Sequence, residues 1–133
     1  MKQTSAGAII YTMISDQRQY LLIKDFHQNI GFPKGHLEKG ETEVQAACRE
    51  ILEEVGITIT LDTSFREELN YIMPNGIAKC SIYFLGYFEN QTPVRQEAEV
   101  QEIIICDYRK ALSLLTFENM KEALQKAENY LNK

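Results

Sequence analysis

The chain contains no tryptophan, and it has only three cysteines. Cys48, Cys80 and Cys106 each lie within an apolar segment, and they show no CxxC spacing. An odd number of scattered cysteines favours buried, reduced thiols over paired ones. The sequence therefore predicts a cytoplasmic protein whose cysteines pack as small apolar side chains.

Long hydrophobic runs are also missing. No apolar stretch approaches the roughly 20 residues that a membrane-spanning helix needs. The N-terminus has no long apolar run before Ser15 and Asp16, so a signal peptide is not expected. We find no internal repeat, low-complexity tract or linker, and 133 residues are enough for a sizeable core. The expectation is one domain, residues 1–133, that contacts no membrane.

Acidic residues outnumber basic residues in this chain. Lys and Arg total 14 against 19 Asp and Glu, which gives a formal net charge of −5. This balance argues against general nucleic acid binding, which requires a basic surface. A small anionic substrate is still compatible with it, because a bound metal ion can reverse the local field.

The most informative stretch runs from Gly35 to Ile57 and reads GHLEKGETEVQAACREILEEVGI. Thr42, with Gln45 three residues on, is typical of a capping box, and Gly56 suits the end of a helix. These signals predict a helix that begins after Thr42 and ends before Gly56. Its apolar residues recur at helical spacing and predict a buried stripe: Val44, Ala47, Cys48, Ile51, Leu52 and Val55.

Carboxylates crowd the last turn of this helix. Glu50 precedes Glu53 by three residues and Glu54 by four, so the side chains share one face. Like charges at this spacing repel, and the end of a helix prefers cations. Arg49 supplies one positive charge, and a divalent cation with oxygen ligands, such as Mg²⁺, would balance the rest. The alternative is an acidic helix end that is merely solvated.

The offsets of these residues match a known pattern. With U as a bulky aliphatic residue, the stretch fits Gx5Ex7REUxEExGU at every specified position, from Gly35 through Glu41 and Arg49 to Ile57. This pattern is the Nudix box, and the chain resembles the Nudix hydrolases, which cleave nucleoside diphosphates linked to another group. The resemblance implies that a divalent metal, Mg²⁺ with Mn²⁺ as the alternative, activates water for attack on a polyphosphate chain.

The resemblance also implies roles for individual residues. The expected metal ligands are Glu50, Glu54, Glu53 and the carbonyl oxygen of Gly35. Arg49 is expected to orient these carboxylates, and Glu41 to hold the loop in place. Such sites are usually completed by a carboxylate from the loop before the last strand, for which Glu99 is the candidate and Glu97 and Glu102 are alternatives. Which carboxylate accepts the proton is left open. The candidate catalytic residues are Glu53, Glu54, Glu50, Arg49 and Glu99.

Similarity outside the box points to one Nudix branch, the asymmetrical diadenosine tetraphosphate hydrolases. It covers most of the chain from Ser5 to Leu131. The runs that carry it are Pro33–His36, Glu67–Tyr71, Lys79 with Ile82–Leu85, and Leu115–Lys121. The resemblance implies a small nucleotide substrate, a dinucleoside polyphosphate, that a monomer or homodimer cuts asymmetrically to ATP and AMP.

The same branch implies which residues bind the substrate. Lys34 and Lys79 would hold phosphates through their ammonium groups. Tyr71 and Phe117 would stack on the two sides of an adenine ring. His36 would hydrogen-bond a phosphate or structure its loop. The alternatives are an exposed strand lysine at Lys79 and core packing at the two aromatic positions.

The chain departs from these relatives at two positions. Ile30 and Ile105 stand where many relatives have tryptophan. The first exchange changes the wall near the site and so bears on base recognition, but it leaves the metal ligands untouched. Tyr83, in a run of apolar residues, is expected to pack in the core.

Other activities stay open at this point. Within the Nudix enzymes they are nucleoside triphosphate pyrophosphohydrolase of the 8-oxo-dGTP type, ADP-ribose pyrophosphatase, and hydrolase of RNA 5′ ends or diphosphoinositols. A non-catalytic alternative is a Nudix domain that senses a nucleotide and regulates a partner. The intact Glu50, Glu53 and Glu54 argue against that alternative.

Apolar periodicity predicts the order of the secondary structure. Strands are expected over residues 3–14, 19–24, 57–61, 65–71, 78–88 and 101–106, and helices after Thr42, from Asp107 through Leu115, and over 117–131. The strand over 78–88 is strongly apolar and is expected to be central. Interleaved strands and helices indicate the α/β class, an α/β/α sandwich with a central mixed β-sheet, which agrees with the Nudix fold.

Overall fold

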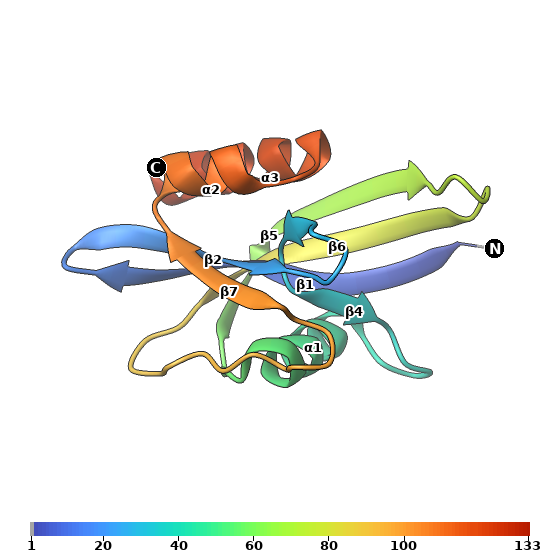
Figure 1. Cartoon of the computed structure of the whole chain (residues 1–133), viewed down its shortest axis with the longest axis horizontal. Coiled ribbons are helices and arrows are strands. Elements are labelled where there is room, and N and C mark those ends of the chain that lie inside the picture. The colour runs from blue at the N-terminus through green and yellow to red at the C-terminus, as the bar shows by residue number, and fades with distance from the viewer. Residues whose placement is uncertain (1) are drawn as a thin grey trace.

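The computed structural model describes residues 2–133, and its centre is a seven-stranded sheet with helices on both faces (Figure 1). The strands are β1 (Gln3–Ile14), β2 (Gln17–Lys24), β3 (Ile30–Gly31), β4 (Lys34–His36), β5 (Thr60–Ile72), β6 (Ala78–Tyr87) and β7 (Glu102–Cys106). The helices are α1 (Glu43–Val55), α2 (Tyr108–Leu114) and α3 (Glu118–Leu131). Within the described residues, no helix combines the length and the apolar character needed to cross a bilayer.

The sheet is mixed, as predicted. Its main path runs β3–β2–β1–β6–β5, with β4 paired to β1 and β7 paired to β2. β1 and β6 are parallel, with Gln3 opposite Lys79 and Tyr11 opposite Tyr87. The other pairs are antiparallel. β6 therefore lies inside the sheet, which confirms its expected central position.

Each face of the sheet buries its own layer of side chains. In Figure 1, α1 lies below the sheet and α2 and α3 lie above it. Ile9 and Leu85 pack with Leu124 in the layer under α3. Ile10 packs with Ile51 in the layer against α1. Successive residues of a strand point to opposite faces, so β1 serves both layers and is buried almost continuously. This arrangement confirms the predicted α/β/α sandwich.

α1 buries a different face from the one that its apolar stripe predicts. The buried members of the stripe are Ala47, Ile51 and Val55, and the exposed members are Val44, Cys48 and Leu52. The prediction is therefore wrong for half of the stripe. Ala46 and Glu54, which lie outside it, are buried instead. The sheet covers only part of the helix circumference, and periodicity does not tell which edge of a wide stripe faces the core.

The three cysteines also differ in burial according to the side of the element on which they lie. All three are free, with Cys80 on β6 buried and Cys106 on β7 half-buried. Cys48 is exposed, so the prediction of a buried thiol is wrong at this position. It lies on the solvent side of α1 together with Leu52, whose side chain is 54% exposed.

Two short strands occupy residues that were expected to form loops. These are β3 and β4, and β2 also begins at Gln17 rather than Gln19. Two or three residues are too few for an alternating pattern, and pairing with β2 and β1 holds them in place. β5 joins two segments that were predicted separately, with an irregularity between Asp62 and Arg66.

The ends of α1 are fixed as the sequence predicts. Gln45 N donates to Thr42 Oγ1 at 3.1 Å and Thr42 N donates to Gln45 Oε1 at 2.9 Å, which completes the capping box. Gly56 has a φ of +69°, a left-handed conformation that glycine adopts without strain. Val94 N donates to Val55 O at 2.9 Å, so the loop after β6 is tied to this end of the helix.

Replacing Gly56 by alanine should lower the free energy of unfolding more than replacing Gly76. Both glycines have positive φ, so alanine at either position costs about 1–2 kcal/mol. At Gly56 a Cβ would also lie 3.1 Å from the carbonyl oxygen of Val94, whereas nothing lies within 4 Å of a Cβ at Gly76. Urea denaturation of Gly56→Ala and Gly76→Ala measures the difference. Equal losses would show that the Val94 segment moves aside without resistance.

Candidate active site

The Gly35–Ile57 stretch folds as β4, a loop and α1, and glycine lets the strand touch the helix. The Glu50 carboxylate lies directly against Gly35, so a Cβ at Gly35 would overlap it. β4 is also pressed against β1, where a Cβ on Gly7 would overlap the carbonyl oxygen of Pro33. The two glycines therefore set how closely the acidic face of α1 approaches the backbone of β4.

Arg49 organises this acidic face. Its Nε and Nη2 atoms donate to the two carboxylate oxygens of Glu41 at 2.7 and 2.9 Å. Nη1 donates to Glu50 at 2.8 Å and to Glu53 at 3.4 Å, and Nη2 also donates to the carbonyl oxygen of His36 at 3.0 Å. The guanidinium holds the pKa of Glu41 well below its usual range, at about 2. These are the contacts that the predicted positioning roles of Arg49 and Glu41 require.

Glu54 is the buried carboxylate of the site. The residue is only 7% exposed, and its Oε2 atom has no hydrogen-bond partner among residues 2–133. Burial raises the pKa of Glu54 to about 8, with the charges of Glu50 and Glu99 acting in the same direction and Lys34 against it. Burial and the neighbouring carboxylates therefore disfavour the charged form of Glu54, and a bound cation would stabilise it.

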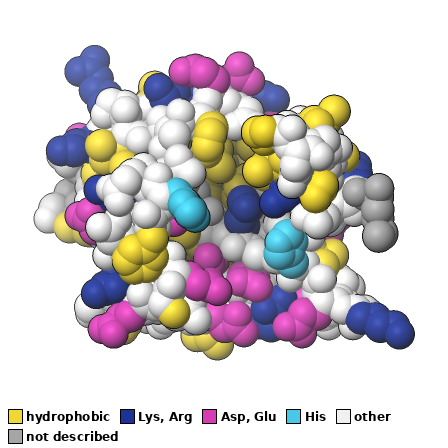
Figure 2. Space-filling model, turned by 45° about the vertical axis from the view of Figure 1, so that its right-hand side comes forward, with side chains coloured by type: hydrophobic (Ala, Val, Ile, Leu, Met, Phe, Trp, Pro, Cys, Tyr) yellow, Lys and Arg dark blue, Asp and Glu magenta, His cyan; other side chains and the backbone are white. Residues whose placement is uncertain are grey.

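Glu54 borders a cavity of about 880 Å³. The space-filling view shows a hollow with basic side chains at its centre, carboxylates below them and hydrophobic side chains above (Figure 2). We call the hydrophobic part the apolar wall; it comprises Leu69, Tyr71, Ile72, Met73, Phe117 and Met120. The cavity therefore brings acidic, basic and aromatic groups together from distant parts of the chain.

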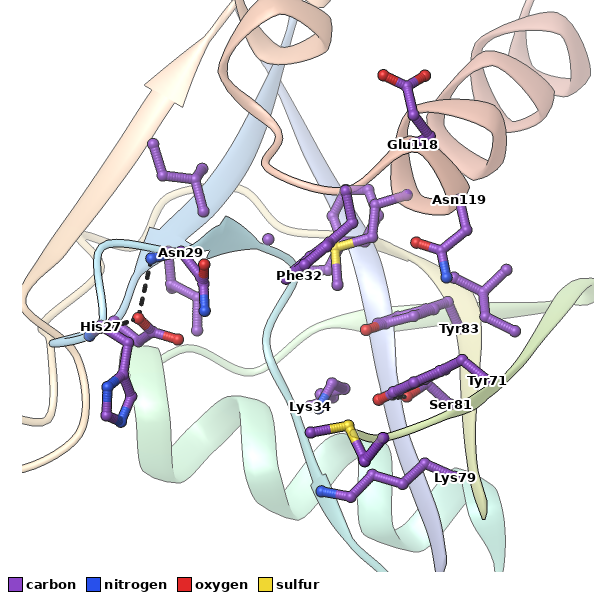
Figure 3. Close-up of a pocket in the computed structure, with 18 of the residues that line it drawn as sticks. His27, Asn29, Phe32, Lys34, Tyr71, Lys79, Ser81, Tyr83, Glu118 and Asn119 are labelled. Carbon is purple, nitrogen blue, oxygen red and sulfur yellow. Dashed lines mark hydrogen bonds between the residues drawn. The ribbon is translucent and has the colours of Figure 1, made fainter. Parts of the chain in front are cut away.

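Many of the predicted site residues line this cavity: Lys34, Glu54, Tyr71, Lys79, Glu99 and Phe117. Figure 3 shows Lys34, Lys79 and Tyr71 directed into the same space from three different strands. The alternatives Glu97 and Glu102 are not part of the lining, so the geometry favours Glu99. Phe117 is 47% exposed, which places its ring at the surface of the cavity rather than in the core.

Other predicted residues lie beside the cavity rather than in its wall: Arg49, Glu50, Glu53, Gly35 and His36. His36 is exposed, its Nδ1 atom lies 3.3 Å from Ser5 Oγ, and its carbonyl oxygen binds Arg49. These contacts favour the alternative in which His36 structures its loop. Glu53 is largely turned to solvent, with its carboxylate at Arg49.

The carboxylates around Glu54 are the type of ligand that a divalent metal ion binds, although they do not converge on a single point in this structure. Among residues 2–133, no three His, Cys, Asp or Glu side chains form a ready metal-binding group. In this arrangement Glu50 and Glu53 accept hydrogen bonds from Arg49 instead. Glu54, with its unpartnered oxygen, and the nearby carboxylates Glu50 and Glu99 offer the hard oxygen donors that Mg²⁺ prefers. The residues present therefore fit such an ion.

Buried polar atoms without a hydrogen-bond partner gather around the cavity. In the described chain they include Glu54 Oε2, the Tyr83 hydroxyl and Asn119 Oδ1, all on residues that line it. Tyr83 packs as predicted, edge-on to Phe32 with ring centroids 5.3 Å apart, but its hydroxyl was not anticipated. Nothing in the sequence singles out Asn119, because a polar residue in the first turn of a helix is usually solvated. An unpaired buried polar group costs about 1–3 kcal/mol, and three such atoms belong to residues that line this one cavity.

Comparisons with known proteins identify the family of the chain. The NUDIX domain profile matches residues 2–127. The asymmetrical bis(5′-nucleosyl)-tetraphosphatase of Sus scrofa is 37% identical over 103 residues, which cover 74% of this chain and 69% of the relative. The protein of the same name from Caenorhabditis elegans is 30% identical over 132 residues, covering 96% of this chain and 95% of the relative.

A solved structure extends the similarity to three dimensions. The binary complex of a C. elegans Ap4A hydrolase superposes with a TM-score of 0.91 and 28% identity, covering 98% of both chains. The fold class and the family predicted from the box are therefore confirmed. The chain belongs to the Nudix family of hydrolases.

Proposed function

We propose that the protein is a Mg²⁺-dependent hydrolase that cuts diadenosine tetraphosphate asymmetrically to ATP and AMP. One observation carries this proposal. A single cavity joins the acidic residues Glu54 and Glu99 to two lysines and then to the aromatic residues of the apolar wall. That order is the order of groups in a nucleotide near its scissile bond: metal-bound phosphate, further phosphates and base. The names of the pig and C. elegans relatives support the choice of substrate.

The acidic end of the cavity would hold the metal. Glu54 and Glu50 are the proposed ligands, with Glu53 and the Gly35 carbonyl as further members of the set. The ion would neutralise phosphate oxygens and lower the pKa of a bound water molecule. Glu99 is the proposed proton acceptor, because it lines the cavity and is the loop carboxylate whose charge acts on Glu54.

The two lysines and the aromatic residues would hold the rest of the substrate. Lys34 and Lys79 are directed into the centre of the cavity, where ammonium groups neutralise phosphate (Figure 3). Tyr71 extends from β5 to the neighbouring strand β6, where its hydroxyl lies 3.3 Å from Ser81 Oγ. Tyr71 and Phe117 would stack on the base, a contact that aromatic faces supply.

Product analysis tests the proposed activity. With Mg²⁺ and diadenosine tetraphosphate, the purified protein should form ATP and AMP in equal amounts, separated by ion-exchange chromatography. Parallel reactions contain ADP-ribose, dGTP and 8-oxo-dGTP, all of which should be cleaved more slowly. Two molecules of ADP would instead indicate symmetrical cleavage. Faster cleavage of ADP-ribose or of a triphosphate would keep the hydrolase chemistry and reject the substrate.

The exchange Glu54→Gln should lower kcat by at least about 100- to 1000-fold, because it removes the charge at the acidic end while keeping its shape. The fold should be retained without metal, because the raised pKa keeps the buried Glu54 carboxyl mainly neutral at pH 7 and the amide matches that neutral form in shape. Steady-state kinetics and thermal unfolding with and without Mg²⁺ measure both effects. Glu97→Gln, in the same loop as Glu99 but outside the cavity lining, is the matched control. Normal turnover in Glu54→Gln would reject the metal-site assignment.

The exchange Tyr71→Ala should raise KM for diadenosine tetraphosphate about 10-fold and change kcat little, because base stacking contributes about 1–3 kcal/mol. Tyr71→Phe keeps the ring, loses only the contact with Ser81 Oγ, and should remain close to the parent protein. Initial rates over a range of substrate concentrations separate KM from kcat. An unchanged KM in Tyr71→Ala would mean that the Tyr71 ring packs within the protein and does not stack on the base.

A further inference from the structure

Asn119 has no structural task in the described chain. It is the second residue of α3, but no side chain caps this helix. Its Oδ1 atom is buried and has no hydrogen-bond partner. Figure 3 shows the amide projecting from α3 toward Tyr83, on the side of the cavity where the apolar wall lies. Asn119 itself is partly exposed, but a buried carbonyl oxygen without a partner is destabilising, and a ligand in the cavity could satisfy it.

The segment that carries Asn119 is fixed to the sheet. Ile30 N donates to Thr116 Oγ1 at 2.8 Å, and Thr116 N donates to Ile30 O at 3.1 Å. On the other side of Asn119, the sulfur of Met120 is so close to Gly31 that a Cβ there would lie 2.8 Å from it. Both contacts are made to β3, the short strand that forms one side of the cavity. The amide is therefore presented from a rigid position.

The surroundings of Asn119 suit the edge of a flat ring. The apolar wall offers aromatic and aliphatic surface to the faces of such a ring, but it has few groups that can pair with polar atoms on the ring's edge. An amide supplies one donor and one acceptor side by side. Adenine presents the complement, an amino donor beside a ring-nitrogen acceptor, and asparagine pairs with it through two hydrogen bonds.

We propose that Asn119 reads the hydrogen-bonding edge of the purine that lies against the apolar wall and is a specificity-determining residue of the enzyme. The oxygen is buried in the free protein, so a rotation of the amide about its last torsion angle would be needed to turn it toward a base in the cavity. The bond that forms satisfies an acceptor that the protein alone leaves unpaired. This inference rests on the proposed function, because it takes the bound group to be the base of a nucleotide substrate.

The exchange Asn119→Asp tests the assignment through a change of preference. A carboxylate only accepts, so it loses the partner of the adenine ring nitrogen and gains two partners in guanine, the N1 and N2 donors. The ratio of kcat/KM for diadenosine over diguanosine tetraphosphate should fall by about 10-fold or more. The new acidic residue lies in the first turn of α3, where the helix dipole favours it, so the fold should be kept. Asn129→Asp adds the same charge at an exposed position of the same helix and should leave the ratio unchanged.

A binding measurement tests whether Asn119 contacts the amino group of the base. NMR titration without divalent metal gives the dissociation constants of AMP and of purine riboside 5′-monophosphate, which lacks the amino group. The parent protein should bind AMP about 10-fold more tightly, and Asn119→Leu should abolish this preference. If Asn119 had a purely structural role, Asn119→Leu would weaken the binding of both ligands equally, and this result would overturn the inference.

The two proposals can fail separately. If diadenosine tetraphosphate is not cleaved but Asn119→Leu removes the preference for AMP, the proposed substrate is rejected and the role of Asn119 stands. If the dinucleotide is cleaved to ATP and AMP while both ratios are unchanged in the Asn119 variants, the inference is overturned and the proposed function stands.

Discussion

One arginine sets the geometry on which the site depends. Glutamates at helical spacing on one face of α1 repel one another, and the Arg49 guanidinium offsets that repulsion by contacting Glu41, Glu50 and Glu53 at once. Because the guanidinium is planar with donors in fixed directions, it orients the loop and the helix together. Glu54 is outside this arrangement. It is the carboxylate that stays buried at the cavity with one oxygen unpaired, which is why it is the first of the proposed metal ligands.

The opposite side of the cavity is held by α3, which is anchored at both ends. Near its C-terminus, Glu128 Oε1 accepts hydrogen bonds from Arg18 Nη1 at 2.7 Å and from the Tyr20 hydroxyl at 2.6 Å. At its start, the backbone and hydroxyl of Thr116 pair with Ile30. A helix fixed at both ends presents its first turn at a defined place. The apolar wall and the acidic end are therefore positioned by separate sets of contacts on one sheet.

Local signals in the sequence predicted the parts of this structure that local physics determines. The capping box of α1 and the left-handed Gly56 follow from spacing and residue type, and the interleaved strands and helices indicated the α/β/α layers, but the order of the strands in the mixed sheet was not predicted. The buried face of α1 did not follow, because the sheet selects it: Leu52 is exposed and Glu54 is buried. The strands β3 and β4 exist only through tertiary pairing. For the site, the pattern located the acidic residues, but the unpaired atoms of Tyr83 and Asn119 become visible only once burial is known.

The division between acidic end and apolar wall explains why the family pattern identifies the chemistry and leaves the substrate open. The pattern is confined to β4, α1, the loop between them and the two residues after α1, whereas Tyr71, Lys79 and Phe117 belong to β5, β6 and the start of α3. A change at the apolar wall leaves the contacts of Arg49 intact, and a change in the acidic cluster leaves the aromatic surface intact. The proposed base recognition and the proposed bond cleavage can therefore vary separately. On this view a single polar side chain beside the apolar wall, Asn119, would tune which nucleotide an otherwise unchanged hydrolase accepts.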